Sequence, residues 1–230
     1  MTHAFDKDYW DRHWEHGGGP EAQEARTANP YLVRETSDLV PGTALDAGCG
    51  EGTEAIWLAS RGWHVTAADI AAEALDRAAS RAAAQTPASN LVRWVEADLT
   101  TWAPGTQFDL VTTNYAHPAM PQLAFYQRIA EWVAPGGTLL IVGHLHGHDP
   151  AGHGSAGHDS AGHDSAGHGD HPPAEASVTA ADVTAVLDRA RWEIVTAEEH
   201  ARTLDGHDGR AVQLRDAVVR AIRRGQRPTR

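Results

Sequence analysis

A glycine-rich stretch, LDAGCGEG at residues 45–52, carries the strongest chemical signal in this sequence. Its three glycines follow a short apolar run and precede a helical pattern, a place where glycine lets the backbone approach a ligand closely. The spacing is G-x-G-x-G, and Thr53 breaks the G-x-G-x-x-G spacing that is typical of nicotinamide sites. Asp46 stands two residues before the first glycine, so its carboxylate could orient the loop or accept a hydrogen bond from a ligand's ammonium group.

Two further acids stand at equivalent places after the next two apolar segments. Asp69 ends HVTAAD, where an acidic side chain can bind both ribose hydroxyls of an adenosine ligand. Asp98 ends LVRWVEAD; its carboxylate could accept from an adenine amino group while the Leu99 backbone N–H reaches a ring nitrogen. Because ligands bind at the carboxyl edge of a parallel sheet, we expect these groups and the glycine loop to meet there.

Strand and helix patterns alternate from residue 43 onward. The apolar runs TALDAG, HVTAAD, LVRWVEAD, FDLVTTNYA and TLLIVGH are separated by helical segments such as TEAIWLASRG, AAEALDRAASRAAA and PQLAFYQRIAEWVA, the last ended by a Pro-Gly-Gly turn. Two later strand candidates, RWEIVTAEEHART and AVQLRDAVV, are joined by LDGHDG, which has hairpin chemistry. The sequence predicts an α/β fold: a Rossmann-like doubly wound sheet of about seven strands, mostly parallel with the last strand antiparallel, and helices on both faces.

The chain divides into four parts: a helical arm (residues 1–42), the strand–helix core (43–144), a His-rich insertion (145–173), and a C-terminal helix, strand pair and basic tail that complete the domain (174–230). On the arm, Trp10 and Trp14 share one helix face, which either packs on the core or covers its site. The insertion repeats AGHGS, AGHDS, AGHDS and AGHGD, and its low apolar content predicts a flexible loop.

Composition limits the possible partners. A net charge of −12 over 230 residues argues against broad binding to nucleic-acid phosphates. No apolar run approaches the ~20 residues of a membrane helix, and the start MTHAFDKDYW lacks a signal-peptide pattern. The single cysteine, Cys49, fits a reducing compartment. We therefore expect a cytoplasmic protein that acts on a small molecule, without nucleic-acid or membrane partners, and the oligomeric state stays open.

The ordered set LDAGCGEG, AADI, EADL, FDLV and APGG resembles the motifs of class I S-adenosylmethionine-dependent methyltransferases over residues 43–144. Within that class, FDKDYWDRHW and DAGCGEGTEAIWLASRGW resemble the bacterial branch related to thiopurine and tellurite-resistance methyltransferases. The resemblance implies methyl transfer from S-adenosylmethionine to a small molecule, with a thiol or another chalcogen nucleophile as a candidate acceptor. Small oxygen and nitrogen nucleophiles stay open as acceptors. The His-rich insertion after the fifth strand departs from that branch.

The resemblance also implies which residues hold each part of the cofactor. It places the loop glycines at the methionine part, Asp69 at the ribose and Asp98 at the adenine, with Arg26 as the candidate for the methionine carboxylate. The predicted cofactor-binding residues are Arg26, Asp46, Gly48, Cys49, Gly50, Gly52, Asp69, Ile70, Asp98, Leu99 and Asn114. We interpret Cys49 as a small inward-facing residue, not as a nucleophile.

Methyl transfer from a sulfonium is an in-line displacement, so the protein mainly holds the nucleophile ~3–3.5 Å from the methyl carbon. The segment TTNYAHP ends the fourth predicted strand and faces this point. There, Asn114 could hold the sulfonium or ammonium, Tyr115 could wall the pocket, and His117 is the best candidate base because its unperturbed pKa lies near neutrality. His144 ends the fifth strand and could face the same cleft. A base is needed only when the nucleophile arrives protonated.

Two other functions stay open. A nicotinamide-dependent oxidoreductase would share the glycine loop and Asp69, but the glycine spacing, Asp98 and the terminal hairpin argue against it. A metal-buffering or metal-delivery protein on the same fold would use the eight histidines between His144 and His171, since imidazole binds Zn²⁺ and Ni²⁺. We predict no metal in the catalytic site itself.

Overall fold

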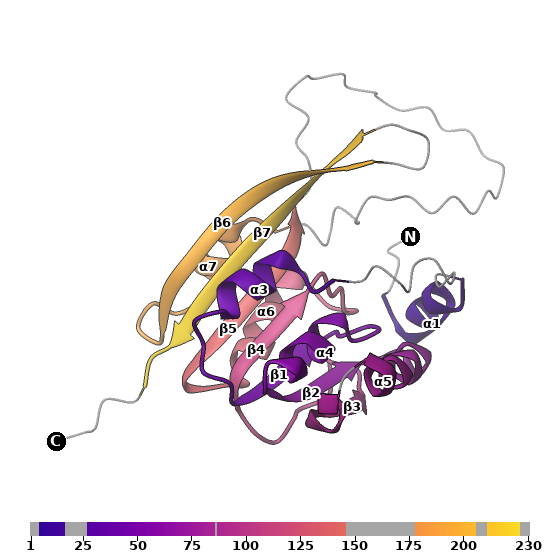
Figure 1. Ribbon diagram of the computed structural model, residues 1–230. Helices are drawn as coiled ribbons and strands as arrows, with labels where there is room; N and C mark the ends of the chain where they lie inside the picture. The colour runs from indigo at the N-terminus through magenta and orange to yellow at the C-terminus, as the bar shows by residue number, and fades with distance from the viewer. Residues whose placement is uncertain (1–4, 17–26, 86, 146–177, 206–210, 226–230) are drawn as a thin grey trace, which may run out of the picture.

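The computed structural model describes residues 5–16, 27–85, 87–145, 178–205 and 211–225 (Figure 1). The predicted insertion lies almost entirely outside the described residues, and Arg26 lies outside them too. Across the described ranges, no helix is long and apolar enough to cross a membrane.

The elements follow the predicted alternation. In chain order they are α1 (Lys7–His16), α3 (Pro30–Thr36), β1 (Thr43–Ala47), α4 (Thr53–Ser60), β2 (His64–Asp69), α5 (Ala72–Gln85), the 3₁₀ turn η1 (Pro87–Leu91), β3 (Val92–Glu96), β4 (Phe108–Asn114), α6 (Gln122–Ala130), β5 (Val133–Leu145), α7 (Ala180–Ala185), β6 (Trp192–Asp205) and β7 (Ala211–Arg223).

Seven strands form one sheet in the order β3-β2-β1-β4-β5-β7-β6. Strands β1 to β5 pair in parallel, and β7 is antiparallel to both of its neighbours, β5 and β6. This arrangement confirms the predicted fold class. The strand order reverses between β1 and β4, which is the switch point where doubly wound sheets bind ligands.

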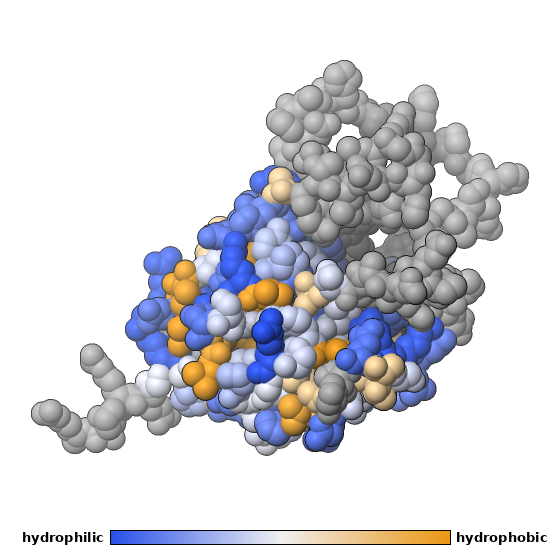
Figure 2. All heavy atoms as spheres, viewed as in Figure 1, coloured by the Kyte–Doolittle hydropathy of each residue, from blue (hydrophilic) through white to orange (hydrophobic). Residues whose placement is uncertain are grey.

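Helices cover both faces of the sheet (Figure 1). Leu32 of α3 and Leu58 of α4 are fully buried in the cluster on one face, and Phe125 of α6 and Val183 of α7 are fully buried in the cluster on the other. The outer surface has no such cluster in the described part: on the face shown in Figure 2, its hydrophobic residues occur in small, separate groups.

Strand β5 begins earlier than the sequence predicts. The Pro-Gly-Gly turn was expected to end a helix, but α6 ends at Ala130 and β5 begins at Val133, before Pro135. Trp132 and Val133 are both buried, so the chain enters the sheet there to bury them. The register against β4 shifts just after Val133, and this irregularity accommodates a proline that lacks an N–H for the ladder.

Candidate active site

The glycine loop follows β1 directly and is held by β2. The backbone N–H groups of Gly48 and Cys49 both donate to the Ala68 carbonyl, over 2.8 and 3.1 Å. Gly48 has a φ of 80°, and a Cβ at this position would clash with the Ala116 side chain. Backbone conformation and space therefore both require glycine here, and the loop lies close against the segment that follows β4.

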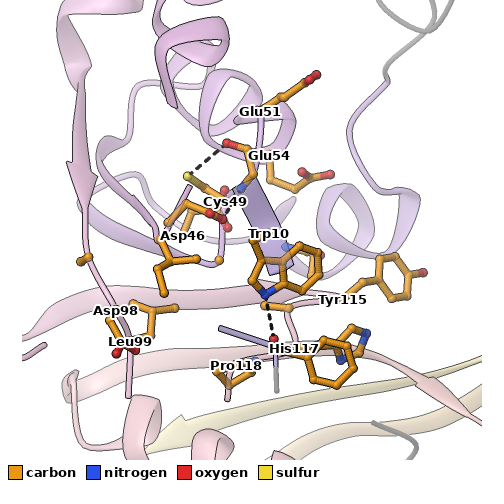
Figure 3. Close-up of a pocket in the computed structure, with 18 of the residues that line it drawn as sticks. Trp10, Asp46, Cys49, Glu51, Glu54, Asp98, Leu99, Tyr115, His117 and Pro118 are labelled. Atoms are coloured by element: carbon orange, nitrogen blue, oxygen red, sulfur yellow. Dashed lines mark hydrogen bonds between the residues drawn. The ribbon is translucent and has the colours of Figure 1, made fainter. Parts of the chain in front are cut away.

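A cavity of about 280 Å³ lies at the carboxyl ends of β1, β2, β3 and β4 (Figure 3). Five carboxylates line it, from Asp46, Glu51, Glu54, Asp69 and Asp98. Within the described chain, no lysine or arginine lines the cavity. A lining of this kind favours a cationic ligand and disfavours an anionic one.

Asp46, at the end of β1, is the most deeply buried of these acids, with 1% of its surface exposed. Burial raises its pKa well above the ordinary value, and the nearby Glu54 and Asp69 raise it further. No group of the described chain hydrogen-bonds to its Oδ2 atom. A buried carboxylate oxygen of this kind is suited to bind a positively charged group of a ligand.

Asp69, at the end of β2, holds the glycine loop as well as lining the cavity. Its Oδ2 accepts from the Gly50 N–H over 2.7 Å, and its Oδ1 accepts from the Ala71 N–H over 3.0 Å. Burial raises the pKa of Asp69, while these backbone donors oppose the increase. The neighbouring Ile70, which we expect to bind the cofactor, also lines the cavity.

Asp98 and Leu99, after β3, line the same cavity. Asp98 Oδ1 accepts from both the backbone N–H and the hydroxyl of Thr100, over 2.8 and 2.7 Å. The Leu99 carbonyl accepts from Arg128 of α6 over 2.8 Å, so this turn is fixed from outside the site. The two hydrogen bonds from Thr100 thereby orient the Asp98 carboxylate.

Gly52 and Cys49 of the loop relate to the cavity in different ways. Gly52 does not line the cavity; it has a φ of 72° before α4, and a Cβ there would clash with the Trp94 ring. Cys49 does line the cavity, but burial raises the pKa of its thiol well above the ordinary value. The thiol therefore stays protonated, in line with the predicted inert role.

Asn114 and Tyr115 end β4 beside the glycine loop. Asn114 donates through its side chain to the Thr112 hydroxyl over 3.2 Å, while its buried Oδ1 has no hydrogen-bond partner among the described residues. Tyr115 has a φ of 58°, the only positive φ of a non-glycine residue in the described chain. Both residues line the cavity, and strained backbone of this kind is concentrated at functional sites.

His117 also lines the cavity and is 9% exposed. Gln122 donates to the Ala116 carbonyl over 2.9 Å, which directs its Oε1 to His117 Nδ1 at 3.3 Å. This arrangement favours a proton on Nδ1 and leaves Nε2 as the acceptor nitrogen. Burial lowers the pKa of His117, so the ring is neutral at pH 7.

Helix α1 lies across the cavity, and two residues of the arm line it: Phe5 and Trp10. The Trp10 indole donates to the His117 carbonyl over 3.3 Å (Figure 3). Lys7, one turn before Trp10 at the start of the helix, donates to the Ile70 carbonyl over 3.1 Å and pairs with Glu96 at 3.0 Å. Of the two tryptophans expected either to pack on the core or to cover the site, Trp10 lines the cavity, whereas the Trp14 side chain lies outside the described part.

His144, predicted to face the same cleft, lies behind the lining and not in it. Its ring stacks on Tyr115 with centroids 4.3 Å apart and lies 5.7 Å from the His117 ring. Sequence patterns also missed Phe5, Glu51 and Glu54 as lining residues, because their contact with the cavity depends on how the arm and α4 pack.

Comparisons with known proteins agree with this geometry. Residues 44–137 match a methyltransferase domain family. A probable thiol methyltransferase of Arabidopsis thaliana is 30% identical over 57% of this chain. The match covers 59% of that relative's length. A trans-aconitate 2-methyltransferase of Azoarcus sp. is 29% identical over 90% of this chain and 76% of its own.

Among solved structures, the magnesium protoporphyrin IX methyltransferase of Synechocystis PCC 6803 shares the fold at 16% identity. Its TM-score is 0.59, and the alignment covers 97% of this chain and 100% of that one. The match to a methyltransferase domain thus covers the strand–helix core, and the sheet order and the likeness to this solved structure show the same fold.

Proposed function

We propose that this protein transfers the methyl group of S-adenosylmethionine to a small-molecule nucleophile, and that the acceptor atom is the sulfur of a thiol or a related chalcogen. The observation that carries this proposal is the carboxylate-lined cavity at the switch point of the sheet, with the glycine loop on one side and aromatic rings on the other. When bound, S-adenosylmethionine supplies a methyl group that is already activated by the positive charge on sulfur.

The cationic methionine end of the cofactor fits the end of the cavity formed by β1 and β4. Asp46 Oδ2 and Asn114 Oδ1 are buried acceptor atoms without a partner in the described chain, and an ammonium group would satisfy both. The backbone of Gly48 and Gly50 would pass close to the methionine part because neither residue carries a Cβ. Arg26, outside the described residues, stays our proposal for the methionine carboxylate.

The adenosine end of the cofactor fits the other side of the cavity, at the ends of β2 and β3. We assign Asp69 to the ribose hydroxyls, since a carboxylate oxygen that accepts one backbone N–H keeps further lone pairs for a hydroxyl. Asp98 and the Leu99 backbone N–H are assigned to the adenine, and Ile70 to its apolar face. Helix α1 would then cover the bound cofactor, because Lys7 and Trp10 fix it above both ends of the cavity.

The lining disfavours a highly charged anionic acceptor. The trans-aconitate relative acts on a tricarboxylate, which needs cationic partners, and none of the described lining residues is lysine or arginine. The acceptor end is lined instead by aromatic and small residues, among them Phe5, Trp10, Tyr115 and Pro118. A neutral, polarizable thiol suits such a surface, and the thiol methyltransferase relative is consistent with that class.

We propose three residues for the acceptor side of the reaction. Tyr115 walls the cavity, and His117 and His144 are the imidazoles that could take a proton from the acceptor. The single cysteine is consistent with a reducing compartment, and we place the enzyme in the cytoplasm. Of the eight histidines that the alternative metal-buffering role would use, seven, from His146 to His171, lie outside the described chain, and that role remains a prediction. Within the described residues, no three potential ligands are grouped.

Calorimetric titration with S-adenosylhomocysteine and with NAD separates the proposed enzyme from an oxidoreductase. We expect S-adenosylhomocysteine to bind at one site and NAD not to bind. Glu51→Gln removes the charge of a lining carboxylate that pairs with Arg77 at 3.2 Å, and it should weaken binding less than Asp46→Asn. Binding of NAD alone would contradict the proposal.

A further inference from the structure

A buried carboxylate that no sequence motif singled out lies next to His144. Asp216 on β7 stands directly opposite His144 on β5 in the antiparallel ladder, so the two side chains share one face of the sheet. His144 Nδ1 lies 3.9 Å from Asp216 Oδ1. The Asp216 side chain is fully buried and that of His144 is 17% exposed. The imidazole therefore lies between a buried carboxylate and the surface of the site.

The other oxygen of Asp216 is held from α3. The Tyr31 hydroxyl donates to Asp216 Oδ2 over 3.2 Å, and the Tyr31 ring stacks on His200 at 5.0 Å. His200, opposite Asp216 on β6, lies 3.0 Å from the Glu198 carboxylate through its Nε2 atom. Because α3 and β6 fix this side of the carboxylate, its Oδ1 atom is directed towards His144.

On its other side, His144 adjoins the acceptor end of the cavity. Its ring stacks on Tyr115 at an interplanar angle of 20° and lies 5.7 Å from the His117 ring, and both of these residues line the cavity. Because His144 lies directly behind these lining residues, a proton released by an acceptor at that end can reach it through one water.

The two imidazoles differ in how well each can carry a positive charge. A general base becomes a cation when it takes a proton, and a buried cation requires a nearby counter-charge. His117 is buried, its Nδ1 faces the neutral amide of Gln122, and burial lowers its pKa. His144 has the Asp216 carboxylate at ion-pair distance. The charge that forms during proton transfer is therefore better stabilised on His144 than on His117.

We propose that His144 takes the acceptor's proton and that Asp216 is the positioning residue that holds it for this step. This assignment rests on the proposed methyl transfer and narrows the acceptor to nucleophiles that arrive protonated at neutral pH, as thiols do. The acceptor sulfur forms a bond to the methyl carbon while the C–S⁺ bond breaks, and that electron pair stays on the leaving sulfur. The thiol proton passes through one water to His144 Nε2, and the 3.9 Å separation of His144 Nδ1 from Asp216 Oδ1 shortens as charge develops on the imidazole.

The test measures kcat of the chain for two acceptors of similar size, with S-adenosylmethionine as the methyl donor. Phenylmethanethiol is protonated at pH 7, whereas 4-nitrothiophenol is ionised and needs no base. Asp216→Asn should lower kcat for phenylmethanethiol roughly 10- to 100-fold, since general bases contribute about 10²–10⁴-fold. It should change kcat for 4-nitrothiophenol less than about twofold, and raising the pH should restore the rate with phenylmethanethiol.

His144→Gln should show the same dependence on acceptor ionisation, which keeps the test decisive if Asp216→Asn folds poorly. Asp38→Asn is the matched control. It removes a carboxylate that pairs at 2.9 Å with Arg220, which lies on β7 as Asp216 does, and it should affect both acceptors equally. Equal losses for both acceptors in Asp216→Asn and His144→Gln would overturn the assignment. If the unaltered chain methylates neither 4-nitrothiophenol nor phenylmethanethiol, the proposed thiol acceptor is wrong, and the base assignment is wrong with it.

Discussion

The Gly50 backbone N–H donates to Asp69 Oδ2 over 2.7 Å, so the acid that ends β2 holds the loop that ends β1. The other oxygen accepts from the Ala71 N–H over 3.0 Å, at the start of the turn into α5. One carboxylate therefore fixes the loop and presents its remaining lone pairs to the cavity. Loop geometry and the proposed ribose binding depend on the same side chain.

Asp69→Ala should weaken binding of S-adenosylhomocysteine at least about tenfold, because a hydrogen bond to a charged group contributes about 1.5–3 kcal/mol. Titration calorimetry measures the effect. Asp76→Ala, which removes an exposed carboxylate from α5, is the control for net charge and should bind normally. Unchanged affinity in a folded Asp69→Ala protein would remove Asp69 from the ribose site.

Asp46→Asn should stabilise the protein while weakening cofactor binding. Burial, then Glu54 and Asp69, raise the pKa of Asp46, so above the ordinary pKa the unfolded chain loses a proton that the folded chain keeps. The free energy of unfolding therefore falls as the pH rises from the ordinary pKa of 3.8 towards the raised pKa of Asp46. The Asp46→Asn protein has no carboxyl group there and does not lose this stability. For a chain of this size, each kcal/mol regained raises the Tm by about 2–4 °C.

Scanning calorimetry of both proteins between about pH 4 and pH 8 checks the sign of this effect. The Tm advantage of Asp46→Asn should be absent at the acid end and grow as the pH increases. An advantage that is constant with pH would mean that packing, and not ionisation, separates the two proteins.

Gly48→Ala should destabilise the protein more than Gly62→Ala. Both glycines have a positive φ, of 80° and 94°, so both substitutions pay about 1–2 kcal/mol for a left-handed backbone. Only the first new Cβ meets another side chain closely, that of Ala116, whereas the second comes no nearer than 3.8 Å to Pro41. Urea denaturation of the two variants compares the costs. Equal losses would show that the loop has room for a side chain.

Tyr115→Gly should be at least as stable as Tyr115→Ala, and by up to about 1 kcal/mol more stable, because glycine relieves the positive φ of 58°. Both variants lose the stacking on His144, so their difference isolates the backbone strain. At Ala119, exposed in the same loop, alanine should be the more stable residue, as is usual. A less stable Tyr115→Gly protein, measured by urea denaturation, would mean that the strain is not relieved.

Much of the fold follows from sequence patterns, because apolar runs that alternate with helical segments predict β1 to β5 as successive parallel strands of one sheet. The hairpin residues between β6 and β7 likewise predict the antiparallel pair. The start of β5 could not be predicted, because Pro135 looks like a helix stop until the burial of Trp132 and Val133 draws the chain into the sheet.

The candidate site divides in the same way. Asp46, Asp69 and Asp98 end neighbouring parallel strands, so their convergence on one cavity could be predicted. Gly52 shared the loop's spacing but serves the packing of Trp94, which only the three-dimensional structure reveals. Asp216 follows no motif, because its place beside His144 arises from the antiparallel register of β7 and β5.

The central claim, methyl transfer from S-adenosylmethionine to a thiol, is tested most directly with a tritium-labelled methyl group. The chain is incubated with the labelled cofactor and a panel of thiols, chalcogen oxyanions, phenols and trans-aconitate, and labelled product is counted. The account predicts label in one or more thiols, none in trans-aconitate, and loss of the label transferred with Asp69→Ala. Label in trans-aconitate alone, or label that is insensitive to Asp69→Ala, would contradict it.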